Sequence, residues 1–277
     1  MSGCDYRRAR LPRSTVTQRS ERPIWSPPVP APRFRIVSAN LWNGAADPEG
    51  FADLVASLGA DVVATQEMAP EQADALARVL PHGALEPARD FMGMGIALRL
   101  PGRVRRLGLP VRDARVAEVH WIGPWGAPLE LEILNVHVLA PHSPPSWAQM
   151  RHRRGQLRGL VRHLEASPRR PRVLVGDLNA TPLWPLYRRL TAHLSDAARS
   201  AARHHGRPVQ RTWGPWPRGP RLLRIDHALV HGVGVADFQV VPIAGGDHSA
   251  IVVDLAAPAA ALPAPAVATA FNGRVGE

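Results

Sequence analysis

The sequence contains one cysteine and no lysine in 277 residues. With Cys4 alone, neither a disulfide framework nor a thiolate metal site can form, so an apolar core has to hold the fold in any redox compartment. No stretch approaches the ~18 consecutive apolar residues of a membrane-spanning helix, and the basic N-terminus lacks the apolar segment of a secretory signal. We therefore expect a cytoplasmic protein without a transmembrane anchor.

Arginine, in contrast, is abundant. The chain has 34 basic against 23 acidic residues and a formal charge of +11. Because alanine, proline and valine are also frequent, part of this bias is typical of a GC-rich genome. The rest favours anionic partners such as nucleic acid, phosphorylated small molecules or acidic membrane surfaces. Apolar residues make up 45% of the sequence, enough for a substantial core.

Two tails flank one domain. Residues 1–33 are basic and rich in serine and proline, a composition that buries little surface and predicts disorder. Residues 257–277 form a second tail rich in alanine and proline. Residues 34–256 therefore make up one domain of about 220 residues, which we expect to be a monomer.

Strand-like and helix-like segments follow one another in mixed order within this domain. Apolar periodicity predicts helices at 48–58, 70–80 and 146–165. It predicts strands at 34–39, 61–66, 95–100, 114–121, 129–138, 172–176, 224–230, 235–241 and 250–255. Because some strands follow each other without a helix between them, we expect a mixed α/β architecture and not a purely parallel sheet.

Polar side chains lie at the ends of several predicted strands. The clearest case is the apolar run 173–175, which ends at Gly176 and is followed at once by Asp177 and Asn179. Taken singly, each such residue also fits a strand cap, a solvated carboxylate or a hydrogen-bonded core histidine. Together they favour a functional site, and they are Asn40, Gln66-Glu67, His137, Asp177 with Asn179, Asp226-His227 and Asp247-His248.

This ordered set, with Gly176-Asp177-Leu178-Asn179 and Gly246-Asp247-His248-Ser249 as its core, resembles the endonuclease/exonuclease/phosphatase superfamily. That superfamily includes DNase I, exonuclease III-type apurinic endonucleases, inositol-polyphosphate 5-phosphatases and neutral sphingomyelinases. The match spans about residues 33–255. The resemblance implies a DNase I-like four-layer α/β/β/α sandwich, with two mixed sheets flanked by helices and the site at one end of the sheets.

The resemblance also implies hydrolysis of a phosphoester with Mg²⁺ or Mn²⁺. Glu67 is then the metal ligand, with Asn40 nearby, and water and phosphate fill the remaining positions of the cation. Asp247 and His248 form the expected pair, in which a carboxylate orients an imidazole that activates water at neutral pH. Asp247 is also a candidate metal ligand.

Four further roles follow from the same resemblance. Asp177 corresponds to the residue that orients or deprotonates the nucleophile, and Asn179 to one that donates to a phosphate oxygen. Asp226 corresponds to a carboxylate that orients the first histidine or protonates the leaving group. His137 is expected to donate to phosphate or, if charged, to act as a general acid. Since apurinic endonucleases have tyrosine at this position, His137 argues against abasic-site repair.

Other polar and aromatic residues have two interpretations each. Arg115 either reaches a substrate phosphate or is solvated at a sheet edge, and residues 151–154 are expected to form a solvated basic face. Trp213 and Trp216 either pack over the end of the domain or present their indoles to a base or to a lipid interface.

The leading hypothesis is a metal-dependent, nuclease-like phosphoesterase. A phospholipid or small-molecule phosphatase of the same fold fits the compact domain equally well. A non-catalytic module that binds an anionic ligand would be expected to lose Glu67, Asp177 or His248, and all three are present. A protein that binds nucleic acid only through its basic tail would show no turnover.

Overall fold

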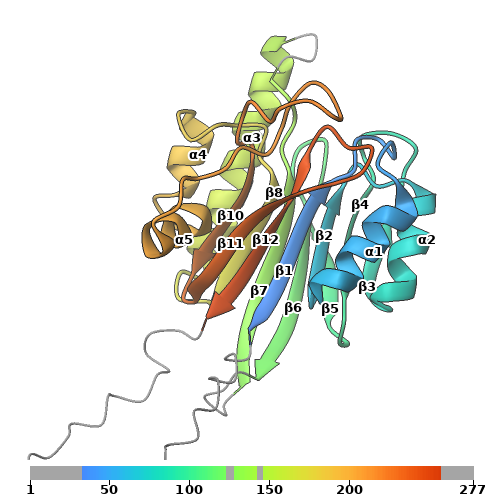
Figure 1. Cartoon of the computed structure of the whole chain (residues 1–277). Helices are drawn as coiled ribbons and strands as arrows, with labels where there is room; N and C mark the ends of the chain where they lie inside the picture. The colour runs from blue at the N-terminus through green and yellow to red at the C-terminus, as the bar shows by residue number, and fades with distance from the viewer. Residues whose placement is uncertain (1–32, 123–127, 142–145, 257–277) are drawn as a thin grey trace, which may run out of the picture. The chain divides into compact units, whose positions relative to one another are not determined.

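The computed structural model describes residues 33–122, 128–141 and 146–256. Apart from residue 33, the two predicted tails lie outside these described residues. The described chain forms two six-stranded sheets, ordered β11-β12-β1-β2-β4-β3 and β5-β6-β7-β8-β10-β9 (Figure 1). No helix in these described segments is long and apolar enough to cross a membrane.

The first sheet contains one parallel pair, β1 with β2, and its other pairs are antiparallel. Asn40 at the end of β1 pairs in register with Gln66 at the end of β2. The strands are β1 (Phe34–Asn40), β2 (Val62–Gln66), β3 (His82–Glu86), β4 (Met94–Leu98), β11 (Gly234–Pro242) and β12 (Ser249–Ala256).

The second sheet also contains one parallel pair, β7 with β8. His137 at the end of β7 pairs with Asp177 at the end of β8, and the antiparallel β10 begins at Asp226, directly opposite Asp177. The strands are β5 (Arg103–Leu107), β6 (Ala114–Ile122), β7 (Pro128–His137), β8 (Arg172–Asp177), β9 (Ser195–Asp196) and β10 (Asp226–His231).

Helices cover the outer faces of both sheets. Buried side chains of α1 (Pro48–Leu58) and α2 (Pro70–Val79) pack on the first sheet, and those of α3 (Ser146–Ala166) and α4 (Pro185–Leu190) pack on the second. A third apolar cluster joins the inner faces of the two sheets. The predicted four-layer α/β/β/α sandwich of mixed sheets is therefore confirmed.

The short helix α5 (Ala197–His205) lies at the edge of the inner core and was not predicted. Its Ala198 and Ala201 join the cluster between the sheets, together with Val230 of β10 and Phe238 of β11. Small side chains let this helix pack close to both strands, so it closes the edge between the two sheets.

All the predicted helices and strands are present, with ends that differ by up to two residues. The sequence missed β3, β5, β9, α4 and α5. The strands β3 and β5 are partly exposed edge strands without regular alternation, and pairing with β4 and β6 holds them in place. The other three are short elements whose apolar residues show no period over a useful length.

Candidate active site

Asn40 and Glu67 lie at the ends of neighbouring parallel strands of the first sheet. Nδ2 of Asn40 donates to Oε1 of Glu67 and to Oδ2 of Asp177, at 3.2 Å each. The Asn43 amide donates to Oε2 of Glu67 at 3.0 Å. Glu67 has a φ of 55°, a conformation that costs energy in a residue other than glycine. Asn40 thus joins two carboxylates that belong to different sheets.

Gln66 and Asn135 bridge the sheets directly beneath these residues. Nε2 of Gln66 donates to Oδ1 of Asn135 at 2.6 Å. Nδ2 of Asn135 donates to the Thr65 and Gly95 carbonyls at 2.8 Å each. Both side chains are fully buried, so this bridge fixes the distance between the strand ends that hold the site.

Asp177 follows a glycine that the backbone requires. Gly176 has a φ of 132°, and a Cβ there would lie 1.9 Å from the Val136 carbonyl oxygen. Oδ1 of Asp177 accepts from the Asn179 amide at 2.7 Å, and Oδ2 accepts from Nδ2 of Asn179 at 3.0 Å. That Nδ2 also donates to the Val138 carbonyl at 3.0 Å. In this arrangement the Asn179 side chain positions Asp177, because both of its amide hydrogens are engaged.

His137 faces the two carboxylates that Asn40 joins. Its Nε2 lies 3.5 Å from Oε1 of Glu67 and 3.6 Å from Oδ2 of Asp177. Burial and the nearby positive charge of Arg112 lower the pKa of His137 well below its usual value. The imidazole is therefore neutral at pH 7, which suits a hydrogen-bond donor to phosphate better than a charged general acid.

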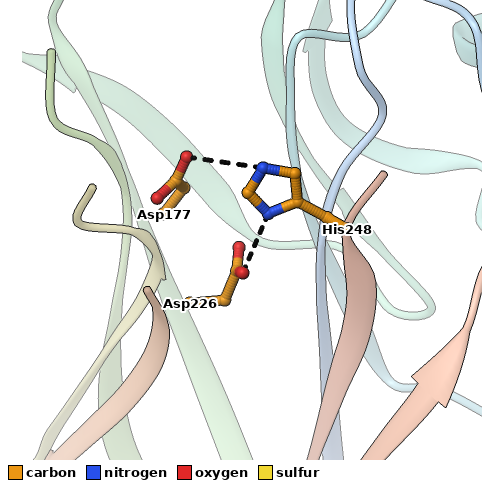
Figure 2. A group of neighbouring side chains, drawn as sticks. All are labelled: Asp177, Asp226 and His248. Atoms are coloured by element: carbon orange, nitrogen blue, oxygen red, sulfur yellow. Dashed lines mark hydrogen bonds and ion pairs between the residues drawn. The ribbon is translucent and has the colours of Figure 1, made fainter. Parts of the chain in front are cut away.

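His248 lies between two aspartates, as Figure 2 shows. Its Nδ1 hydrogen-bonds Oδ2 of Asp226 at 2.9 Å, and its Nε2 lies 3.9 Å from Oδ2 of Asp177. Burial opposes the charge on this imidazole, but Asp226, Asp177 and Asp247 together raise the pKa of His248 to about 9. The same charge lowers the pKa of Asp226 despite its burial.

The pKa of Asp177 shifts in the direction opposite to that of Asp226. Burial, together with the negative charge of Asp226, raises the pKa of Asp177 to about 7. Two aspartates that face one histidine thus have their pKa values moved apart. Such a difference is typical of groups that exchange protons near neutral pH.

The expected pairing of Asp247 with His248 is not found, and the structure corrects it. Oδ2 of Asp247 accepts from Nε1 of Trp213 at 3.0 Å, and Asp226 orients the imidazole instead. Neighbouring side chains on extended backbone point in opposite directions, so Asp247 turns away from the ring of the next residue. Asp226, expected to orient the first histidine, contacts His248 and not His137.

The site opens into a cavity of about 670 Å³. Glu67, His137, Asp177, Asn179, Asp247 and His248 line it, so six of the residues that the sequence singled out converge on one space. Asn40 and Asp226 contact this group through the hydrogen bonds given above. The cavity also has aromatic walls, formed by Trp42, Phe91, Trp184 and Trp213.

Arg112 is a site residue that the sequence analysis missed. It lines the cavity with a side chain that is 4% exposed. Its Nη1 donates to the His137 carbonyl at 3.3 Å, and its Nε has no hydrogen-bond partner within the described chain. Burial lowers the pKa of Arg112 to about 10, which leaves it charged at pH 7. The only local signal was an arginine just before a strand, which is too common to single it out.

Two other arginines have roles different from those expected. Nε and Nη2 of Arg115 each lie 2.9 Å from an oxygen of Glu86, so Arg115 is a buried tie between β6 and β3. Arg153, expected on a solvated face, is buried and donates to the carbonyls of Leu139 and Asn179. It therefore holds the loops after β7 and β8 together beside the site.

The two tryptophans of the loop before β10 differ. Trp213 lines the cavity and donates to Asp247, whereas Trp216 is mostly exposed. The loop thus contributes one indole to the wall of the site. Whether Trp216 contacts a base or a lipid stays a prediction.

The donor set fits a divalent cation of the Mg²⁺ type. Oδ1 of Asp247 is buried without a hydrogen-bond partner. Glu67, Asp177 and Asp226 have no arginine within ion-pair distance in the described chain. One carboxylate oxygen of Asp177 lies within 4.8 Å of one of Asp226. Buried carboxylates in excess over their counter-charges are what a hard cation requires.

Comparisons with known proteins show what this chain resembles in sequence and in fold. The sequence model of the Endonuclease/Exonuclease/phosphatase family matches residues 37–248. Among curated proteins, none matches this chain significantly. Many solved structures do match in fold.

One similar structure is an endonuclease/exonuclease/phosphatase from Bacteroides vulgatus, with a TM-score of 0.61 and 19% identity over 82% of this chain and 99% of that one. D. rerio TDP2 complexed with a single-strand DNA product has a TM-score of 0.59 and 18% identity over 81% and 99% of the two chains. The human nocturnin catalytic domain with a bound sulfate anion has a TM-score of 0.56 and 17% identity, over 81% of this chain and 94% of that one. At such low sequence identities, the similarity to these structures shows a shared fold and nothing more.

Proposed function

Because this chain belongs to the Endonuclease/Exonuclease/phosphatase family, we propose that it is a metal-dependent phosphoesterase of the nuclease type. It hydrolyses a phosphodiester by attack of an activated water. The observation that carries this proposal is the Asp226–His248 hydrogen bond of 2.9 Å, with the free Nε2 of His248 directed toward Asp177 (Figure 2). The TDP2 neighbour with its single-strand DNA product supports the choice of a nucleic-acid substrate.

The metal-holding role falls to Glu67, with Asn40 hydrogen-bonded to it and Asp247 lining the same cavity. Glu67 has no arginine partner in the described chain, and one oxygen of Asp247 is buried and unpartnered. A bound Mg²⁺ or Mn²⁺ would neutralise charge on the phosphoryl oxygens. Asn40 holds Glu67 against Asp177 through its two 3.2 Å hydrogen bonds.

Asp177 and His248 position the nucleophile between them, and Asp177 deprotonates it. The 3.9 Å between Nε2 of His248 and Oδ2 of Asp177 is longer than a direct hydrogen bond. A water placed beside both atoms would interact with each. With a pKa of about 7, Asp177 is ionised in a large fraction of molecules at neutral pH and accepts a proton from water. Asp226 keeps the imidazole of His248 in the orientation that directs Nε2 into the cavity.

The phosphoryl group is bound by neutral and positive donors that line the same cavity. Nε2 of His137 and the guanidinium of Arg112 are the available groups, since both line the cavity. Arg112 has no carboxylate partner within ion-pair distance among the described residues, so its charge is available to an anion. Charge-assisted hydrogen bonds of this type are stronger than neutral ones.

Turnover on a substrate panel tests the proposal. Purified protein is incubated with Mg²⁺ or Mn²⁺ and plasmid DNA, RNA, bis-p-nitrophenyl phosphate, p-nitrophenyl phosphate or phosphoinositides, beside His248→Ala and a chelator control. We expect metal-dependent cleavage of the nucleic acids and of the diester, lost in the variant. Release of phosphate from monoesters or phosphoinositides alone would select the phosphatase alternative. No metal-dependent turnover on any substrate would contradict the assignment.

A further inference from the structure

The solvent-facing side of α3 carries a row of arginines that leads away from the site. Arg151, Arg154, Arg158 and Arg162 are all exposed. Their spacing of three and four residues places them on one face of the helix. With a rise of 1.5 Å per residue, the row is about 16 Å long. We call these four residues the α3 arginine row.

The α3 arginine row is not neutralised by neighbouring acids. Within the described chain, no ion pair involves any of the four guanidinium groups, whereas Arg78 and Arg89 on the other side pair with Glu49 and Glu71. The only acidic residue of α3 is Glu165, in its last turn. A solvated helix face normally mixes charges of both signs, and this one does not.

The two helix layers differ in charge, and composition alone does not explain why. The helices on the first sheet, α1 and α2, contain four acidic residues and one arginine. Those on the second sheet, α3 and α4, contain seven arginines and one acidic residue. A genome that favours arginine would enrich both layers alike. The segregation therefore points to a function of the α3 side.

The α3 arginine row begins two residues after Gln149, which lines the active-site cavity. Gln149 lies in the first turn of α3. Trp147 precedes Arg151 by one turn on the same face, and it is 72% exposed. Figure 1 shows α3 running along the outside of the second sheet, from the end where β7 and β8 finish. A flexible polyanion that leaves the cavity at Gln149 meets Trp147 and then the row.

From these observations we propose that the α3 arginine row binds the backbone of a single-stranded nucleic acid whose scissile phosphate lies in the cavity. This rests on the proposed phosphoesterase function and specifies its substrate. The cations bind successive phosphates, and the indole of Trp147 stacks on a base between the cavity and the row. The cavity of about 670 Å³ has aromatic walls, on which the bases of a single strand can stack.

A membrane surface fits this charge pattern less well. The helix α3 runs along the second sheet, away from the end where β7 and β8 finish (Figure 1), so a flat bilayer at that end touches only its first turn. A strand bends around the edge of the mouth and reaches all four arginines. Membrane binding is kept as a separate outcome of the test below.

The test measures binding of labelled dT12 and rU12 to the full chain by fluorescence anisotropy, with EDTA present to prevent cleavage. The variant Arg154→Gln/Arg158→Gln is compared with Arg103→Gln/Arg203→Gln, which removes the same charge from exposed arginines outside the row. A phosphate contact with a single strand contributes a slope of about −0.7 to log K against log salt. Loss of two contacts is expected to weaken binding about 25-fold at 0.1 M salt and to reduce the slope by about 1.4.

The control variant should bind like the wild type. Equal losses in the two variants would overturn the proposal, since they would show only a response to net charge. Binding to phosphatidylserine vesicles without binding to either oligonucleotide would overturn it in favour of a membrane. A difference between dT12 and rU12 would identify DNA or RNA as the ligand.

Failure of this inference is distinguishable from failure of the proposed function. Hydrolysis of bis-p-nitrophenyl phosphate by the wild type needs the catalytic residues and not the row. If that diester is cleaved and the row variant binds oligonucleotides like the wild type, the inference fails alone. If the row variant binds them more weakly but the diester is not cleaved, the chain is a nucleic-acid-binding protein and the proposed function fails.

Discussion

The two ends of the sandwich bury charge in different ways. At the end where β7 and β8 finish, Glu67, Asp177, Asp226 and Asp247 lie near one charged histidine and one arginine that contacts none of them. At the opposite end each buried carboxylate has arginine partners at ion-pair distance. The first arrangement leaves charge for a ligand, and the second uses it for the fold.

The opposite end is closed by two sets of ion pairs. Arg35 and Asp254 are cross-strand neighbours on β1 and β12, and the guanidinium donates to both carboxylate oxygens at 2.6 and 2.7 Å. Glu132 lies 3.6 Å from Arg172 and 3.1 Å from His163. Burial alone would raise the pKa of Glu132, but His163, Arg172 and Arg170 lower it. These carboxylates have counter-charges within ion-pair distance before any ligand arrives.

Residues with a strained backbone also gather at the site end of the sandwich. The five non-glycine residues with positive φ in the described chain are Trp42, Asn43, Glu67, Val111 and Asn179. Four line the cavity, and Val111 precedes Arg112, which also lines it. Strain and unpaired charge at the same end are typical of a functional site, whose cost the rest of the fold has to offset.

The largest expected effect is on catalysis at the site end. His248→Ala removes the imidazole next to Asp177 and is expected to lower kcat on bis-p-nitrophenyl phosphate about 10³-fold. The matched control is His120→Ala, an exposed histidine of β6 whose side chain is 70% exposed. A loss of less than tenfold in His248→Ala, or equal losses in both variants, would argue against His248 as a catalytic residue.

The next effect concerns the closed end. Asp254→Asn leaves the buried Arg35 without its carboxylate and is expected to destabilise the protein by about 3–5 kcal/mol. Urea unfolding measures this change. Because Asp254 lies at the end opposite the cavity, kcat of the folded variant should stay within about twofold of the wild type. A stable Asp254→Asn variant would show that the ion pair contributes little.

The pH dependence of stability should differ between the two ends. The pKa of His248, about 9 in the folded chain, lies above its unfolded value of about 6.5. Its contribution to stability is therefore full below pH 6.5 and is lost as the pH rises through 9. Glu132, whose pKa is lowered, instead contributes above its unfolded pKa, and that contribution is lost as the pH falls through its folded pKa.

This difference is measured by urea unfolding of the wild type and His248→Ala between pH 6 and 10, without metal. The wild-type advantage should shrink by roughly 3 kcal/mol over that range. In NMR titrations, one histidine should titrate near 9 and His227 near 4. A constant advantage, together with a His248 pKa near 6.5, would contradict the arrangement described here.

The smallest expected effect is a gain in the free energy of unfolding, opposite in sign to the loss expected for Asp254→Asn. Since the pKa of Asp177 is raised to about 7, its ionised form destabilises the fold at pH 8. We expect Asp177→Asn to raise the free energy of unfolding by about 1–2 kcal/mol at that pH while abolishing activity. Destabilisation of this variant would mean that hydrogen bonds from Asn40 and Asn179 outweigh the cost of burying the charge.

Much of this fold follows from local patterns. Periodicity predicted α1 with its correct ends and the strands on both sides of it, because apolar spacing and proline are local signals. The polar residues after these strands also followed from order along the chain, since parallel neighbours end at the same edge of a sheet. Gly176-Asp177-Leu178-Asn179 was the strongest of these signals.

The sequence by itself determined which residues gather at the site: the strand ends carry Asn40, Glu67, His137, Asp177 and His248. Only the tertiary structure decided which of them touch. It paired His248 with Asp226, 22 residues away, in place of the adjacent Asp247, and it brought Arg112 into the cavity. The physical reason is that contacts across two sheets depend on how the sheets face each other, and no local pattern of side chains encodes that distance.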